Sequence, residues 1–350
     1  MVSYAPIKEM DDLVERTRTV ANVLKLRRQL DEEIPKRTEE TLLLATWNIR
    51  EFKDNRRKES LYYIAEILSR FDLIAVQEVS TDLKGLEKVM QLMDPSWTYI
   101  VTDSTEGDAG GSERMAFIFD RKKITFGKMA GEIVLTGDNL VLTTVQFART
   151  PFCVSFRAKW FRFKLATVHI FYGTSKSDPG KKRRIDEIEK IAKFLTKRSK
   201  KENESYILLG DFNIEGTKDV TMQALESEGF YIPDTIKKHP TDLGQKKHYD
   251  QIAFNLKLEE HMHVFSEGEQ KSGAFNFTKS VYCLEDCEEY KQYFPKEQQA
   301  KTEDKRLAYF KTYYRTYQMS DHIPLWVELK IDFSDQYLKK IKSEETPINS

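Results

Sequence analysis

Cysteine is scarce in this sequence: a chain of 350 residues contains three, Cys153, Cys283 and Cys287. A low and odd number of cysteines does not form the disulfide framework of a small secreted protein. Cys283 and Cys287 are close enough to share a helical face, but no other cysteine or histidine stands at zinc-finger spacing from them. We therefore expect ordinary thiols and no structural metal site.

Long apolar runs are also missing, so no segment is predicted to cross a membrane. The N-terminal segment carries Glu9, Asp11, Asp12 and Glu15 and lacks the apolar core of a secretory signal. These features predict a cytoplasmic protein without a membrane span. No segment indicates an obligate protein partner.

The sequence has no net charge, because 56 Lys and Arg residues balance 56 Asp and Glu residues. Overall charge therefore does not indicate nucleic-acid binding, and any anion site must be local. Three catalytic patterns are absent as well: the Gly-rich phosphate loop, the Gly-x-Ser-x-Gly elbow and a reactive Cys-His arrangement. If the chain is a catalyst, its catalytic residues must belong to a different pattern from these three.

Short apolar strands and amphipathic helices alternate along most of the chain, which is typical of an α/β domain. A charged helix over 8–33 comes first, followed by helices at 58–70, 82–93, 181–200 and 217–228, the last with Thr217 as its cap. Strands are predicted at 41–45, 72–76, 115–119, 140–147, 163–168, 206–209, 250–254 and 324–331. Because no strong linker divides the chain, we expect a helical extension at 1–40, one domain at 41–333 with an insertion at about 259–318, and a C-terminal tail at 334–350.

The segment at 206–213 shows how a strand could deliver reactive groups. Apolar residues run directly into Gly210-Asp211-Phe212-Asn213. If the extended chain continues, Asp211 and Asn213 point to the same side. Two oxygen-bearing side chains there suit a hard metal ion or a phosphate oxygen, although Asp and Asn after a strand also form ordinary turns.

Most other predicted strands also lie next to polar groups that can bind a metal or move a proton. Each group alone has an ordinary explanation as a turn, a cap or a surface charge, but the recurrence is unexpected on that basis. Sites gather at one edge of an open α/β sheet, so we expect these side chains to converge. The candidates are Asn48, Glu78, Glu113, Arg149, His169, Asp211, Asn213, Asp250, Asp321 and His322.

Carboxylates and histidines in this combination fit phosphoester hydrolysis. Glu78, Asp211 and Asp321 offer the hard oxygen ligands that Mg²⁺ prefers, and the ion stabilises charge in the transition state. A histidine can deprotonate water at neutral pH, and a carboxylate beside it fixes its tautomer.

Seven motifs, taken in order, resemble those of the endonuclease/exonuclease/phosphatase superfamily, and most closely its deoxyribonuclease I-like branch. They are Trp47-Asn48-Ile49-Arg50, Gln77-Glu78-Val79, Ser112-Glu113-Arg114, Val168-His169, Gly210-Asp211-Phe212-Asn213, Tyr249-Asp250-Gln251-Ile252 and Ser320-Asp321-His322. The resemblance covers roughly residues 41–331. It implies a four-layer α-β-β-α sandwich with the site across one edge of two facing sheets.

The resemblance also implies a role for each candidate. The implied metal ligands are Glu78, Asn48 and Asp321, with Asp211 touching a second ion; the metal is Mg²⁺, with Mn²⁺ and Ca²⁺ as alternatives. The implied general base and acid are His322 paired with Asp250 and His169 paired with Glu113. Asp211 and Asn213 are implied to orient the water or the phosphate, and Arg50 and Arg149 to contact the substrate.

Several features differ from those of small secreted nucleases. The sequence predicts neither a signal peptide nor a disulfide pattern, and it predicts an N-terminal helix and a longer stretch between Asp250 and Asp321. We expect a metal-dependent phosphodiester hydrolase, a nuclease acting on DNA or RNA. The alternatives are a phosphatase or phosphodiesterase acting on a phosphoinositide or another small phosphoester, and a catalytically silent binding module.

Four basic clusters are candidate polyanion contacts: residues 181–184, residues 197–201, Lys246-Lys247-His248, and Arg306 with Lys311 and Arg315. The first two fit the solvated ends of a charged helix. The last lies among five aromatic residues and leads into Asp321 and His322. There, aromatic and basic residues could hold a nucleic acid, or the aromatic residues could simply pack a helix.

Overall fold

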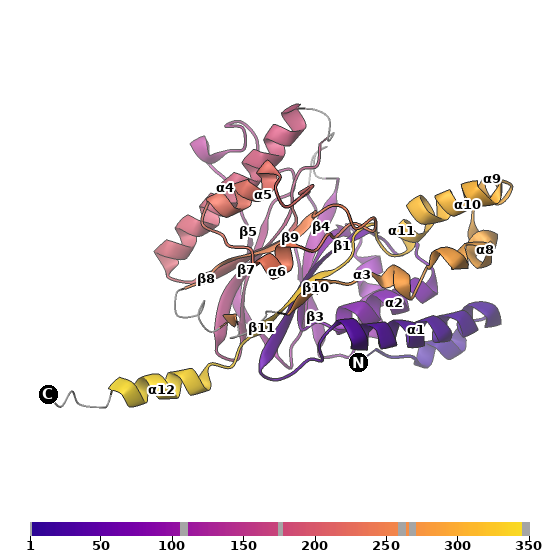
Figure 1. Cartoon of the computed structure of the whole chain (residues 1–350), viewed down its shortest axis with the longest axis horizontal. Helices are drawn as coiled ribbons and strands as arrows, with labels where there is room; N and C mark the ends of the chain where they lie inside the picture. The colour runs from indigo at the N-terminus through magenta and orange to yellow at the C-terminus, as the bar shows by residue number, and fades with distance from the viewer. Residues whose placement is uncertain (1, 106–110, 174–177, 258–263, 266–270, 345–350) are drawn as a thin grey trace.

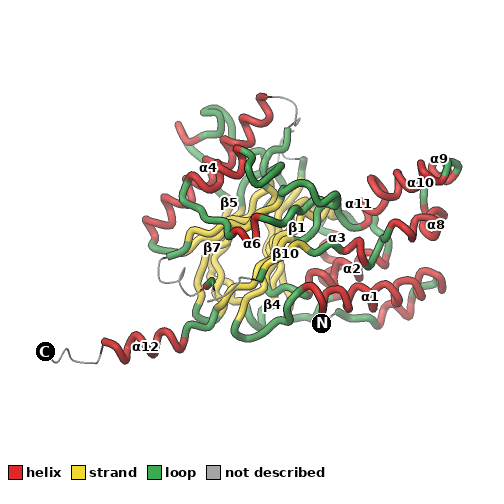
Figure 2. The backbone as a smooth tube through the Cα atoms, viewed as in Figure 1, coloured by secondary structure: helices red, strands yellow, loops and turns green. Residues whose placement is uncertain are grey.

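The computed structural model of the chain describes residues 2–105, 111–173, 178–257, 264–265 and 271–344. Two β-sheets lie face to face at its centre (Figure 1; strands yellow in Figure 2). The first sheet contains, in spatial order, β10 (Ser272–Ala274), β11 (Leu325–Lys330), β1 (Thr41–Phe52), β2 (Leu73–Ser80), β4 (Glu113–Asp120) and β3 (Trp97–Val101). The second contains β5 (Ile124–Glu132), β6 (Phe152–Ala158), β7 (Phe161–His169), β8 (Ser205–Asp211) and β9 (Asp250–Asn255).

Helices cover both outer faces of this pair of sheets (Figure 1). The second sheet is covered by α4 (Asp178–Glu202) and α5 (Val220–Ser227), and α6 (Asp234–Lys237) lies near β9, β10 and β11. The first sheet is covered by η1 (Ala5–Glu9), α1 (Leu13–Glu33), α2 (Lys58–Ser69) and α3 (Lys84–Leu92). This arrangement confirms the predicted α-β-β-α sandwich.

The remaining helices lie in the later part of the chain, apart from η2 (Gly137–Asn139). They are η3 (Phe277–Lys279), η4 (Leu284–Asp286), α8 (Cys287–Tyr290), η5 (Lys291–Tyr293), α9 (Lys296–Gln299), α10 (Glu303–Tyr309), the π-helical turn η6 (Phe310–Tyr314), α11 (Arg315–Gln318) and α12 (Ser334–Glu344). Helices α8 to α11 extend on the side of α1 and α2, whereas α12 projects away from the sandwich (Figure 1). In the described residues, no helix combines the length and the apolar character needed to cross a bilayer.

Alternation along β1 shows why its strand lies between two apolar layers. Leu42 and Leu44 belong to the core that joins the two sheets. Leu43 and Ala45 belong to the core that joins the first sheet to α1 and α2. Because successive side chains of a strand point to opposite faces, a nearly continuous apolar run fills both layers.

The prediction of a strand at 140–147 is wrong. Leu142 and Thr143 have φ angles of 47° and 64°, so the chain turns, and Val141 pairs with Val145 in an isolated bridge. Strands β5 and β6 flank this segment. Neither was predicted from the sequence, and β3 and β10 were not predicted either. Most of β5 is exposed at the sheet edge, so it lacks the apolar pattern of a buried strand.

Two predicted helices begin later than expected because an aspartate caps each of them. Asp12 accepts hydrogen bonds from the N–H groups of Val14 (2.8 Å) and Glu15 (3.2 Å), so the predicted helix over 8–33 divides into η1 and α1. Asp219 caps α5 in the same way, in place of Thr217. Side-chain oxygens of this kind satisfy the free N–H groups of a first helical turn.

The segment predicted as an insertion packs around tyrosine and phenylalanine rings. Phe310 and Tyr314 on η6 pack against the buried Tyr282 and Tyr290. Its strand β10 extends the first sheet, and residues 258–263 and 266–270 lie outside the described residues. All three cysteines are buried and free, and no described cluster of metal-ligating side chains contains one.

Candidate active site

Strand register brings three of the predicted site residues together. His169 at the end of β7 is paired with Asp211 at the end of β8, and Asp211 is paired with Asp250 at the start of β9. Gly210 has a φ of 133°, and a Cβ there would lie 2.2 Å from the carbonyl oxygen of Val168. Only glycine fits this close approach of β7 and β8 directly before Asp211.

Asn48 connects Glu78 to the row formed by His169, Asp211 and Asp250 at the strand ends. Its Nδ2 donates to Glu78 Oε1 at 2.9 Å and to Asp211 Oδ2 at 3.1 Å, and the N–H of Glu51 donates to Glu78 Oε2 at 2.9 Å. The buried Oδ1 of Asn48 has no hydrogen-bond partner in the described part of the chain. An unsatisfied buried oxygen costs about 1–3 kcal/mol. A cation beside Asn48 and the carboxylate of Glu78 offsets that cost, so these oxygen donors fit a hard divalent ion.

His322 forms the first histidine-carboxylate pair. Its Nδ1 lies 2.8 Å from Asp250 Oδ2, and the ring of Tyr249 lies against the imidazole at 5.3 Å between centroids. Burial alone lowers the pKa of His322, but the charges of Asp250 and then Asp211 outweigh it and raise this pKa well above 6.5. With Nδ1 held by Asp250, Nε2 is the atom left for chemistry.

His169 forms the second pair, with Glu113. The Nδ1 of His169 lies 2.5 Å from Glu113 Oε1, and the guanidinium of Arg149 contacts the same carboxylate oxygen. Burial acts to lower the pKa of His169, but the charge of Glu113 raises it overall. Burial acts to raise the pKa of Glu113, but His169 and Arg149 lower it, so Glu113 is a carboxylate at neutral pH.

Both histidines face the same carboxylate. The Nε2 of His169 lies 3.6 Å from Asp211 Oδ2, and the Nε2 of His322 lies 3.8 Å from the same oxygen. The site is compact: in each of two groups of three side chains, the atoms that could bind a metal lie within 4.8 Å of one another. They are Glu78, Glu113 and His169, and Asp211, Asp250 and His322.

Asn213 is held by hydrogen bonds of both its backbone and its side chain. Its N–H donates to Asp211 Oδ1 at 2.8 Å, its Nδ2 donates to the carbonyl of Ile170 at 2.7 Å, and its φ is 54°. Glu78 also has a left-handed backbone, with φ of 59°. Non-glycine residues in this region cost about 1–3 kcal/mol, a strain that clusters at functional sites.

Arg184 is a positioning residue that the sequence prediction missed. It was predicted in a solvated helix end, but it is buried and donates to the carbonyls of Asn213 (2.9 Å), Phe171 (3.3 Å) and Tyr172. The guanidinium thus ties α4 to the two loops that follow β7 and β8. No sequence signal distinguishes it from the exposed basic residues beside it.

Arg50 and Asp321 lie together at the other side of the site. Arg50 Nη1 is 3.7 Å from Asp321 Oδ2, and the guanidinium also donates to Thr316 Oγ1 (2.9 Å) and Tyr317 OH (3.0 Å). Asp321 does not belong to either of the metal-competent groupings found among the described residues. Its predicted role as a metal ligand stays a prediction.

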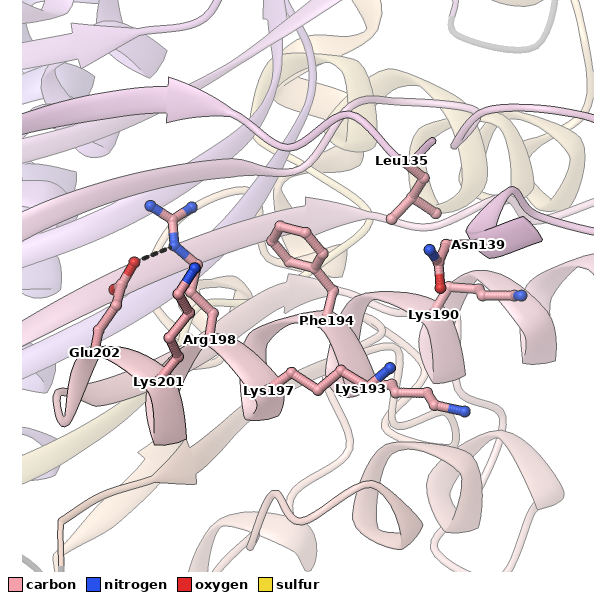
Figure 3. Close-up of a pocket in the computed structure, with 9 residues that line it drawn as sticks. All are labelled: Leu135, Asn139, Lys190, Lys193, Phe194, Lys197, Arg198, Lys201 and Glu202. Carbon is pink, nitrogen blue, oxygen red and sulfur yellow. Dashed lines mark hydrogen bonds and ion pairs between the residues drawn. The ribbon is translucent and has the colours of Figure 1, made fainter. Parts of the chain in front are cut away.

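The basic clusters prove to be locally paired in several places. Lys181 pairs with Asp219, Arg183 with Glu187 and Arg198 with Glu202. A cavity of about 500 Å³ lies along α4 between Lys190 and Glu202, where several lysines point outward around Phe194 (Figure 3). None of the candidate site residues lines this cavity.

Comparison with known proteins identifies the family. The sequence profile of the Endonuclease/Exonuclease/phosphatase family matches residues 45–236. The chain belongs to this family. Proteins of this family are hydrolases that act on phosphoesters and generally use a divalent metal, for which the oxygen donors around Glu78 and Asn48 are suited.

Solved structures of this family share the fold. An endonuclease/exonuclease/phosphatase family protein from Bacteroides thetaiotaomicron superposes with a TM-score of 0.53 and 18% identity, covering 83% of this chain and 95% of that one. A mannosyl-6-phosphatase from the same organism gives 0.52 and 16%, covering 82% and 99%. TDP2 from D. rerio, complexed with single strand DNA product, gives 0.52 and 12%, covering 83% and 99%. No curated protein sequence matches the chain.

Proposed function

We propose that this chain is a divalent-metal-dependent phosphodiesterase that cleaves nucleic acid. The observation that carries the proposal is that His169 and His322 direct Nε2 towards the same oxygen of Asp211, at 3.6 and 3.8 Å. One phosphate bound beside Asp211 lies within reach of both imidazoles. A base on one side and an acid on the other match in-line attack of water and departure of an alkoxide.

Each residue then has a chemical task. His322, with Nδ1 held by Asp250, accepts a proton from the attacking water at Nε2. His169, with its pKa raised by Glu113, donates a proton from Nε2 to the leaving oxygen. Asp211 and Asn213 orient the water and the phosphate. Glu78 and Asn48 would hold the divalent metal, which would supply charge stabilisation for the phosphoryl oxygens.

A row of tyrosines supports nucleic acid as the substrate. Arg50 lies over the ring of Tyr317 at 4.0 Å. Tyr317 lies 4.5 Å from Tyr313, and Tyr313 stacks on Tyr309 at 5.4 Å, between ring centroids. Tyr313 is half exposed, and successive bases stack on aromatic rings presented in this way. The row starts beside the proposed catalytic centre, so an extended strand can reach both.

A substrate panel tests the proposal. Purified chain is incubated with supercoiled plasmid, single-stranded DNA, RNA, mannose 6-phosphate and phosphoinositide vesicles, each with Mg²⁺ or with EDTA. We expect cleavage of at least one nucleic acid, only in the presence of metal. Phosphate release from the small phosphoesters without cleavage of any nucleic acid would instead establish the phosphatase alternative.

The catalytic assignment is tested by a pair of histidine variants. His322→Ala is expected to abolish most turnover, whereas His239→Ala, which removes a histidine outside the site, is expected to retain it. Equal activity of the two variants contradicts the role of His322. No turnover of any substrate by the wild-type chain would favour a binding module.

A further inference from the structure

A second cavity borders the proposed catalytic centre. Its volume is about 300 Å³, and it lies between the loop that precedes β9 and the helical segment formed by η6 and α11. His322 and Asp321 line it, but Glu78, Asn48 and His169 do not. The cavity therefore opens on the His322 side of the site and not beside Glu78 and Asn48, the two residues proposed above to hold the metal.

Arg315 lines this cavity and has no counter-ion among the residues that the structure describes. Its exposed fraction is 6%, and its Nε donates to the carbonyl of Lys311 at 3.1 Å. Across the described residues, no carboxylate lies within ion-pair distance of its guanidinium. The acidic group whose charge would raise the pKa of Arg315 is the thiol of Cys283. Burial raises the pKa of this thiol, so it is uncharged at neutral pH and does not balance the charge of Arg315. A buried charge is costly unless it is paired.

Lys311 adds a second cation, one helical turn before Arg315. It lines the same cavity, is exposed, and forms no ion pair with a described carboxylate. The π-helical turn η6 contains Lys311, and such turns are frequent at functional sites.

The two carboxylates that line the cavity are already compensated. Asp242 accepts hydrogen bonds from three backbone N–H groups, those of Gly244, Lys246 and Lys247. Asp321 faces the guanidinium of Arg50 at 3.7 Å. Among the described residues, the cations of the cavity therefore have no carboxylate counter-ion while its anions are compensated, which favours an anionic ligand.

We propose that Arg315 and Lys311 bind a second phosphate group of the substrate, adjacent to the phosphate that is hydrolysed. The identity of the hydrolysed phosphate rests on the proposed function. The substrate class is then a phosphoester with two phosphates, with the second on the His322 side. This phosphate is either the neighbouring one in a nucleic-acid strand or the terminal one of a small molecule.

Binding without turnover tests the subsite. In EDTA, calorimetry measures the affinity of wild type for the dinucleotide TpT, for its 5′- and 3′-phosphorylated forms, for the trinucleotide TpTpT, and for fructose 6-phosphate and fructose 1,6-bisphosphate. We expect one second phosphate to tighten binding about 10-fold or more, the scale of a charge-assisted hydrogen bond. A gain for the nucleotides identifies a strand, and a gain for the bisphosphate alone identifies a small molecule.

Three variants locate the effect. Lys311→Ala and Arg315→Gln are expected to remove the gain while leaving the affinity for TpT unchanged. Lys305→Ala removes an exposed lysine of α10 that does not line the cavity, and it is expected to retain the gain. Because Lys311 is exposed, Lys311→Ala remains informative if Arg315→Gln fails to fold.

The outcomes separate this inference from the proposed function. Equal affinity of wild type for ligands with one and two phosphates overturns the subsite, even if TpT is hydrolysed when Mg²⁺ is added. Equal gains in wild type and Lys311→Ala overturn the role of Lys311. A gain that depends on Lys311, with no hydrolysis of any nucleotide in Mg²⁺, supports the subsite and refutes the phosphodiesterase.

Discussion

Replacing Asp250 by asparagine changes the charge beside His322 while keeping the size of the side chain. In the wild type, Asp250 Oδ2 lies 2.8 Å from His322 Nδ1 and holds the proton on that nitrogen. An amide can donate to Nδ1 instead, which places the imidazole proton on Nε2. The atom that should accept a proton from water is then blocked.

The size of the effect follows from this contact. A hydrogen bond to a charged partner contributes about 1.5–3 kcal/mol. Each 1.36 kcal/mol of barrier is about a factor of ten in rate, so loss of the charge alone slows the reaction about 10- to 150-fold. The wrong tautomer adds to this loss, up to the factor of about 10²–10⁴ that a general base contributes.

Stability is expected to behave differently from activity. Burial raises the pKa of Asp250, although the contact with His322 acts in the opposite direction. Burial disfavours the charge of Asp250, but that charge also stabilises protonated His322, so the two effects oppose each other and a neutral amide of equal size should change the melting temperature little. A purely structural role for Asp250 predicts the reverse: a lower melting temperature with little change in kcat.

The pH profile supplies a second readout. The neighbouring carboxylates raise the pKa of His322 against the effect of burial, so its neutral, basic form increases only well above pH 6.5. If His322 is the base, the rate rises with pH in this region, and Asp250→Asn moves that rise to lower pH. The assay is kcat from pH 5 to 10 for wild type, Asp250→Asn and, as a control, Asp234→Asn on the surface. At least half of wild-type turnover at every pH in Asp250→Asn would refute the assignment.

Three further predictions concern Gly210, the proposed metal ligand Glu78 and the tyrosine row. Gly210→Ala should destabilise the fold by about 2–5 kcal/mol in urea unfolding, because its Cβ meets a backbone oxygen at a positive φ, whereas Gly216→Ala, in open space, should be nearly neutral. Mg²⁺ should raise the melting temperature of wild type but raise that of Glu78→Gln less; equal shifts place the ion elsewhere. Tyr313→Ala should weaken single-stranded DNA binding by about 1–3 kcal/mol in a fluorescence titration, without affecting hydrolysis of bis(p-nitrophenyl) phosphate. Unchanged DNA affinity contradicts base stacking on the tyrosine row.

Much of the site could be predicted because several of its residues lie at the ends of strands. His169, Asp211 and Asp250 follow or begin apolar runs, and the register of β7, β8 and β9 sets them side by side. The alternation of elements predicted an α/β domain, and the resemblance of the motifs to the family implied the sandwich. β5 was missed because most of its side chains are exposed and no buried face imposes a pattern on it, whereas β6 was missed although it is mostly buried.

The buried arginines show a different limit. Arg184 and Arg315 stand in basic stretches that resemble solvated helix faces. Arg184 proves to bind backbone carbonyls of two loops, and Arg315 proves to line a cavity where no described carboxylate pairs with it. Backbone carbonyls that are distant in the sequence can belong to any residue type, so the sequence does not identify them as partners. Only the folded structure does.

The most direct test is a crystal structure of the chain with Mg²⁺ and a dinucleotide whose bridging oxygens resist hydrolysis. We expect one phosphate beside Asp211, within hydrogen-bond distance of Nε2 of both His169 and His322, and the ion on Glu78 and Asn48. A phosphate that contacts only one of the histidines, or an ion bound away from Glu78, would contradict this expectation.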